Sequence, residues 1–170
     1  MSEKKYRVIQ WATGVVGSAA LKHFIQNPVI DLVGVLVFNP DKVGKDAGDL
    51  VGLAKTGVIA TDDQEAIIAM DADCVLFSPL NMADTSLDLV CRLLASGKNV
   101  VSPAGPFLPN KWFPEVAAKI EAACVRGGTP SISLTIAMPC QCTVTPCGRA
   151  LVNSARSRSP LRRRISRAGT

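Results

Sequence analysis

The segment that most constrains the fold is residues 6–21. A short, largely apolar run is followed by a turn of small residues, and a helical pattern begins directly after the turn. Against the phosphate-binding pattern GxGxxG the register is Ala12-x-Gly14-x-x-Gly17, with alanine in place of the first glycine. This order predicts a strand, a tight loop and a helix whose amino-terminal N–H groups can receive a phosphate group.

The residue types in this loop suggest a role for each position. A side chain at Gly14 would obstruct the approach of a pyrophosphate, and Gly17 lets the helix pack closely on the preceding strand. The N–H groups of Val15 and Val16 would face the phosphate charge. The predicted dinucleotide contacts are therefore Ala12, Thr13, Gly14, Val15 and Val16. The alternative is a strand-to-helix turn that needs small residues for its shape alone.

Strand-like and helix-like segments alternate along the chain. Predicted strands cover residues 6–11, 30–38, 58–60, 73–77 and 99–102, with a further candidate at 131–136. Predicted helices cover 15–26, a segment after the acidic cap 61–65, 84–96 and 112–126, whereas the glycine-rich section 42–56 is predicted to be a loop. This alternation predicts an α/β fold of the Rossmann type, a doubly wound parallel sheet, over residues 1–136.

Charge is distributed unevenly. Residues 1–129 hold twelve Lys/Arg and all fourteen Asp/Glu, a net charge of −2, whereas residues 130–170 hold seven Arg and no acid. We therefore predict that 137–170 is a basic tail of low order. Its richness in Arg, Ser, Pro and Cys favours a frameshifted or truncated end; a genuine disordered tail and a cloning artefact are the alternatives. Its CxCxxxxC spacing does not predict a metal site, because a fourth ligand is lacking.

Length and composition indicate the number of domains and the cellular location. The length of 170 residues fits one domain, and 48% of the residues are apolar, as in a globular protein. No apolar run is long enough to cross a bilayer, and no signal-peptide core follows the first residues. These features predict a cytoplasmic protein without membrane partners.

Three segments carry a resemblance to a known family: WATGVVG at 11–17, FSP at 77–79 and VSPAGPF at 101–107. The first ~130 residues resemble the amino-terminal domain of dihydrodipicolinate reductase-like oxidoreductases, and the branch that includes 2,4-diaminopentanoate dehydrogenase is the more similar one. The resemblance implies that Ser78, Pro79 and Ser102 lie near the nicotinamide end of a bound NADP(H) or NAD(H).

The resemblance also implies an activity: hydride transfer between a nicotinamide and a small imine or amino-acid-derived substrate. In the family a second domain binds this substrate and helps to form the oligomer. Residues 130–170 lack a counterpart of the reductases' His-His and Lys-bearing motif. We therefore assign no catalytic residue and expect this chain to be inactive by itself.

The form of the cofactor depends on residues after the second strand. An acidic side chain there would bind the ribose 2′-hydroxyl of NAD, but the position holds Asn39, followed by Lys42 and Lys45. This pattern favours NADP(H) over NAD(H), unless the two lysines merely face solvent.

A second function class is a non-catalytic protein whose arginine-rich tail binds nucleic acid. Such binding would rest on phosphate contacts alone, because residues 130–170 hold no aromatic side chain for base stacking. Sequence-specific recognition of nucleic acid is therefore not expected.

Overall fold

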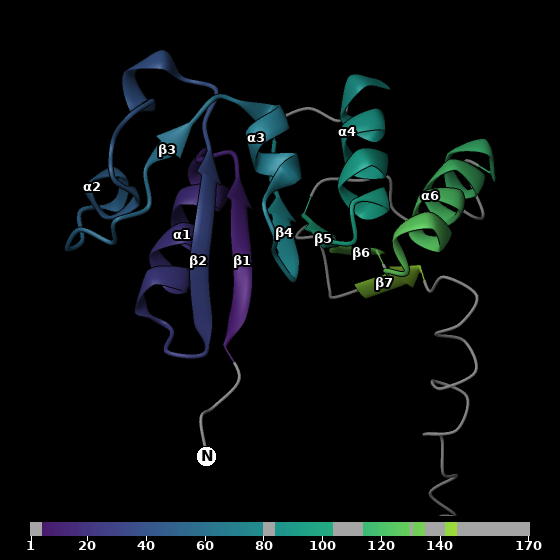
Figure 1. The fold of residues 1–170 in the computed structure, drawn as a ribbon, viewed down its shortest axis with the longest axis horizontal. Helices are drawn as coiled ribbons and strands as arrows, with labels where there is room; N and C mark the ends of the chain where they lie inside the picture. Colours follow the sequence, from purple (N-terminus) through teal and green to yellow (C-terminus); the bar gives the residue numbers. More distant parts are fainter. Residues whose placement is uncertain (1–4, 80–83, 104–113, 130, 135–141, 146–170) are drawn as a thin grey trace, which may run out of the picture.

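The computed structural model describes residues 5–79, 84–103, 114–129, 131–134 and 142–145 (Figure 1). They form one sheet of seven strands in the order β3-β2-β1-β4-β5-β6-β7. The strands are β1 (Tyr6–Trp11), β2 (Ile30–Leu36), β3 (Ala60–Thr61), β4 (Cys74–Phe77), β5 (Asn99–Ser102), β6 (Ser131–Leu134) and β7 (Cys142–Thr145). Strands β1 to β6 pair in parallel, and β7 pairs antiparallel with β6.

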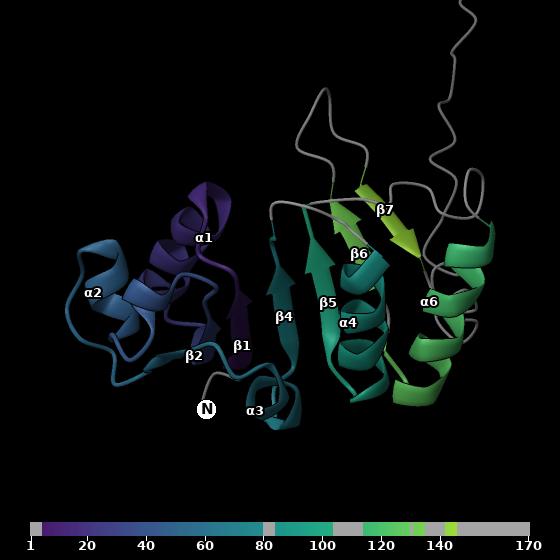
Figure 2. The same ribbon diagram turned by 90° about the horizontal axis from the view of Figure 1, so that it is seen from above.

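Helices cover both faces of this sheet, as Figure 2 shows from above. They are α1 (Val15–Gln26), the 3-10 helix η1 (Pro40–Lys42), α2 (Ala47–Val51), α3 (Gln64–Ala69), α4 (Asp84–Ala95) and α6 (Pro114–Gly127). Apolar side chains of α1 and α2 form one core with β2 and β3, and those of α3, α4 and α6 form the other with β1, β2, β4 and β5. The predicted doubly wound α/β fold is confirmed.

Strand β2 contains an irregularity that determines which core each of its side chains joins. The β1–β2 register moves from Val8↔Leu32 to Ile9↔Gly34, so that Val33 is passed over. A Cβ atom at Gly34 would lie 2.9 Å from Met70 Sδ, so glycine lets the segment that ends α3 pack closely on β2. Val33 belongs to the core beneath α3. Two successive positions thus face the same helix layer, as expected at a β-bulge.

The section predicted as a loop, 42–56, contains the short helix α2, and on this point the sequence reading was wrong. The carboxylate of Asp46 caps the helix by accepting from Gly48 N at 2.8 Å, and it also accepts from Thr56 N at 2.9 Å and Gly57 N at 2.8 Å. These hydrogen bonds, led by that from Thr56, lower the pKa of Asp46. Gly52, with φ of +70°, ends the helix. Of the glycines that suggested a loop, Gly48 lies within the helix and Gly52 ends it.

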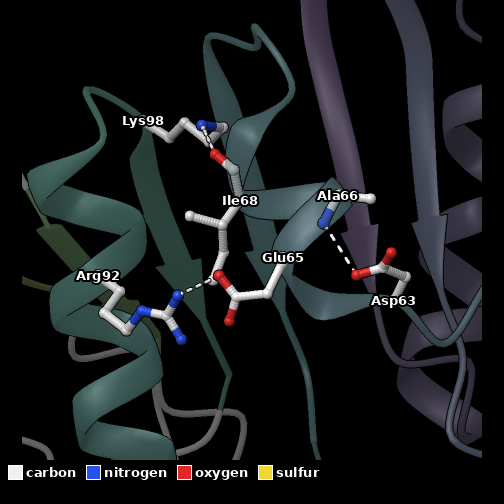
Figure 3. Close-up of polar contacts among 6 residues, drawn as sticks. All are labelled: Asp63, Glu65, Ala66, Ile68, Arg92 and Lys98. Atoms are coloured by element: carbon white, nitrogen blue, oxygen red, sulfur yellow. Dashed lines mark hydrogen bonds and ion pairs between the residues drawn. The ribbon is translucent and has the colours of Figure 1, made fainter.

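Polar contacts fasten α3 to α4 and to the start of β5 (Figure 3). Asp63 accepts a hydrogen bond from Ala66 N at 3.0 Å and so caps α3, and Arg92 of α4 forms an ion pair with Glu65. The ammonium of Lys98, only 3% exposed, donates to the Ile68 carbonyl at 2.7 Å. Burial lowers the pKa of Lys98. The buried cation lies at the carboxyl end of α3, where the helix dipole favours positive charge.

The carboxyl-terminal part of the chain adds a strand that the sequence did not predict. Strand β7 lies within 137–170, the range assigned to the basic tail, and residues 146–170 are outside the described residues. Among the described residues, none of the helices has the length and apolar character that crossing a membrane requires. The same residues contain no cluster of three His, Cys, Asp or Glu suited to a metal ion; Cys140 and Cys147 are not among them.

Candidate functional site

The predicted phosphate loop, residues 12–14, joins the carboxyl end of β1 to α1 in the middle of the sheet. Strand β1 lies between β2 and β4. From β1 the chain adds strands first toward β3 on one side and then toward β7 on the other. Ala12 N donates to Leu36 O at 3.0 Å, and Ser78 N donates to Trp11 O at 3.1 Å. The loop therefore lies at the topological switch point, where open α/β sheets form their ligand crevice.

Ala12 occupies the first position of the glycine pattern and has a left-handed backbone, with φ of +73°. Among the described residues it is the sole non-glycine with a positive φ. Its carbonyl accepts from Gln10 Nε2 at 2.7 Å, and the Ser78 hydroxyl lies 3.4 Å from the same oxygen. Left-handed backbone costs an alanine about 1–2 kcal/mol. Glycine is therefore the residue this turn prefers, and the surrounding hydrogen bonds hold alanine in its place.

Gly17 is required by packing. A Cβ atom there would lie 2.1 Å from Ala12 O, and 2.9 Å from both Gln10 Nε2 and Ser78 Oγ. Real Cβ atoms do not approach backbone oxygens this closely. The close contact of α1 with the loop and β1, expected from the sequence, is thus present in the structure.

Gly14 differs from Gly17, because none of the described residues requires glycine there. Its φ of −71° is open to any residue, and no atom of the described residues lies within 4 Å of an added Cβ. Within the described part of the chain no side chain caps the amino end of α1, and the first turn of the helix holds no acidic residue. Val15 is 91% exposed and Val16 is 46% exposed. The uncapped helix end is therefore open and electropositive, which suits an anion.

Thr13 links this loop to the segment after β2. Its carbonyl accepts from Lys42 Nζ at 2.8 Å and from the Ser18 hydroxyl at 3.0 Å, and its own hydroxyl lies 3.2 Å from Lys42 Nζ. Asn39 is exposed, and its side-chain oxygen accepts from Asp41 N at 2.9 Å. Lys45 is exposed nearby in the chain. Of the residues predicted to select the cofactor form, Lys42 thus contacts the loop directly.

The remaining predicted positions follow the next two strands. The hydroxyl of Ser78 donates to Trp11 O at 3.1 Å, so it supports the loop from the end of β4. Pro79 is half-buried, and Ser102 is buried at the end of β5. Sequence reasoning missed Gln10, whose side chain is fully buried and whose Nε2 donates to Ala12 O. A glutamine within the buried strand β1 was the available signal.

No family model matches the chain, but individual known proteins are similar to it in sequence. An amine dehydrogenase of Streptomyces virginiae is 38% identical over 125 residues, which are 71% of this chain and 35% of that protein. A 4-hydroxy-tetrahydrodipicolinate reductase of Synechococcus elongatus is 29% identical over 122 residues, 69% of this chain and 44% of the reductase. Over about 70% of its length the chain is thus similar to an amine dehydrogenase and to a dihydrodipicolinate-type reductase. It spans less than half the length of these two relatives.

Solved structures show the same fold. The amine dehydrogenase of Mycobacterium smegmatis superposes with a TM-score of 0.66 at 24% identity, covering 74% of this chain and 38% of its own. A biliverdin reductase of Synechocystis, solved with biliverdin and NADP+, gives a TM-score of 0.58 at 19% identity, covering 75% of this chain and 37% of its own. Both superpose over less than half of their own length. The similarity therefore concerns the Rossmann-type domain.

Proposed function

We propose that this domain binds a nicotinamide dinucleotide, with the pyrophosphate against the amino terminus of α1. The observation that carries the proposal is Gly14, where glycine is needed neither by the backbone, with φ of −71°, nor by packing, since no atom of the described residues lies within 4 Å of an added Cβ. A ligand that approaches the backbone closely would require glycine at this position. The exposed, uncapped first turn supplies N–H donors for the pyrophosphate.

The residues after β2 support NADP(H) as the preferred form. Asn39 offers no carboxylate to repel a 2′-phosphate, and the exposed ammonium of Lys45 provides positive charge in the same segment. The positions of Ser78, Pro79 and Ser102 at the ends of β4 and β5 support their assignment to the nicotinamide end. Both assignments depend on the proposed position of the dinucleotide at the switch point of the sheet.

We further propose that the domain serves an oxidoreductase acting on a small imine or an amino-acid-derived compound. Support comes from the relatives, an amine dehydrogenase and a 4-hydroxy-tetrahydrodipicolinate reductase. Hydride transfer requires the substrate carbon about 3–3.5 Å from the nicotinamide. Residues 130–170 have no counterpart of the reductases' catalytic motif. We therefore expect dinucleotide binding without turnover of dihydrodipicolinate or 2,4-diaminopentanoate by this chain alone.

Calorimetric titration with NADPH and NADH tests the proposal. Wild-type protein is expected to give a saturable signal in the micromolar to millimolar range, and Gly14→Val is expected to abolish it by filling the pyrophosphate space. Ala19→Val is the matched control, because it places the same side chain on the exposed face of α1. Absence of a saturable signal for both nucleotides with folded wild-type protein contradicts the proposal.

A further inference from the structure

The ammonium of Lys42 lies against the backbone of the phosphate loop. Its Nζ is 2.8 Å from the Thr13 carbonyl oxygen and 3.2 Å from the Thr13 hydroxyl. Lys42 ends η1, 29 positions beyond Thr13, and its side chain is half-buried. Hydrogen bonds from a charged donor are about twice as strong as neutral ones. The contact therefore fixes one specific peptide group of the loop.

A second side chain donates a hydrogen bond to the same oxygen. The hydroxyl of Ser18, in α1, donates to the Thr13 carbonyl at 3.0 Å. The peptide between Thr13 and Gly14 is planar and trans, so the Gly14 N–H points opposite to the Thr13 carbonyl. Two side chains that fix the carbonyl thereby also fix the direction of the Gly14 N–H, at the entrance to the open end of α1.

The backbone of Ala12 explains why the Thr13 carbonyl needs to be held in place. Ala12 has φ of +73°, a conformation that an alanine leaves readily for a negative φ. Rotation at Ala12 would turn the peptide planes that follow it, beginning with that of Thr13. A glycine at position 12 would adopt this turn without strain. With alanine there, contacts from other residues are required to maintain the turn.

We infer that Lys42 and Ser18 form a clamp on the Thr13 carbonyl that positions the phosphate loop for both forms of the dinucleotide. Lys42 is then a positioning residue and not the residue that distinguishes NADP(H) from NAD(H). The inference rests on the proposed dinucleotide binding. Its physical basis is preorganisation: donors that are already oriented before binding need no ordering when the pyrophosphate arrives.

The test measures the dissociation constants of NADH and NADPH for four variants. Lys42→Met is expected to weaken both nucleotides about tenfold and by the same factor, because it removes a charge-assisted hydrogen bond from the loop. Lys42→Arg restores most of the affinity, and Ser18→Ala weakens both nucleotides to a smaller extent. Lys55→Met is the matched control, since it removes an exposed lysine from the loop after α2, and it leaves both constants unchanged.

A loss confined to NADPH in Lys42→Met overturns the inference, because Lys42 would then recognise the 2′-phosphate. Unchanged affinity for both nucleotides overturns it as well. Amide hydrogen exchange examines the clamp without any ligand, at Ala12 N, bonded to Leu36 O at 3.0 Å, and at Ser18 N, bonded to Gly14 O at 2.8 Å. Both amides exchange faster in Lys42→Met if the clamp exists. If the wild type binds neither nucleotide, the proposed function fails, and this exchange result alone decides on the clamp.

Discussion

Replacing Gly14 by serine should separate the stability of the domain from its ability to bind a dinucleotide. The backbone at Gly14, with φ of −71° and ψ of −164°, is the extended conformation that a helix N-cap adopts, and an added Cβ meets no atom within 4 Å in the part of the chain that the structure describes. Serine is among the preferred N-cap residues, whereas α1 now has no side-chain cap. The folded state therefore accepts Gly14→Ser without strain.

The expected gain in the free energy of unfolding has two sources. Serine in place of glycine at an N-cap contributes a few tenths of a kcal/mol. Restricting the unfolded chain by removing a glycine contributes about 0.4–1 kcal/mol more. Together they predict about 1 kcal/mol, or a rise in melting temperature of roughly 3–5 °C for a domain of this size. Urea unfolding followed by tryptophan fluorescence measures the change.

Binding should change in the opposite direction. The serine hydroxyl would accept from first-turn N–H groups that the pyrophosphate needs, and its side chain would occupy the phosphate position. We expect the dissociation constant for NADPH to rise about tenfold or more, as for the loss of one to two hydrogen bonds to a charged group. Ala19→Ser, on the exposed face of α1, should leave binding unchanged. A Gly14→Ser protein that is destabilised by 1 kcal/mol or more, or that binds as tightly as the wild type, would refute this reasoning.

Further predictions concern packing, pH, thiol reactivity and the tail. Gly17→Ala should lower the free energy of unfolding by about 3 kcal/mol, because its Cβ would lie 2.1 Å from a carbonyl oxygen; a neutral result in urea unfolding would contradict the packing argument. The pKa of Asp46 is lowered from its ordinary 3.8 by hydrogen bonds led by that from Thr56, so its carboxylate stabilises the fold above that pH and the contribution is lost as pH falls through the folded pKa. Asp46→Asn should therefore flatten the acid-induced drop in melting temperature. Burial raises the pKa of Cys74 to about 11, so iodoacetamide should modify this thiol near neutral pH only after unfolding, as mass spectrometry can show. Deleting 146–170 should leave the melting temperature unchanged, because this arginine-rich segment offers few apolar side chains to a core.

The order of most strands and helices could be predicted because their boundaries have local signals in the sequence. Helix α1 begins after Gly14 and ends at Asn27, where the sequence indicated. Helix α2 was missed because part of its support comes from Asp46 contacts with Thr56 and Gly57, ten and eleven positions away, which no local pattern encodes. Strand β7 was missed for a similar reason, since its place at the edge of the sheet depends on its pairing with β6.

Within the site, the sequence identified the positions of the loop but not the contacts that hold it. Gly17 was correctly assigned to close packing because the pattern GxGxxG has a geometric meaning at that position. The bond between Lys42 and Thr13 joins segments that are 29 positions apart, so only the folded chain reveals it. The role of Gln10 likewise depends on where the carbonyl of Ala12 points.

The passed-over residue in β2 makes the number of residues in that strand as important as their identity. After Gly34, Val35 and Val37 face the core shared with α1, whereas Leu36 faces the core of α3 and α4. Deleting Val33 would leave Leu32 and Gly34 adjacent, with their partners Val8 and Ile9 in β1 unchanged, so the strand would lose the bulge and keep both sets of inward-facing side chains. A second deletion in the strand would exchange the two sets of side chains beyond it. The bulge therefore gives this central strand one residue that it can lose without a change of faces.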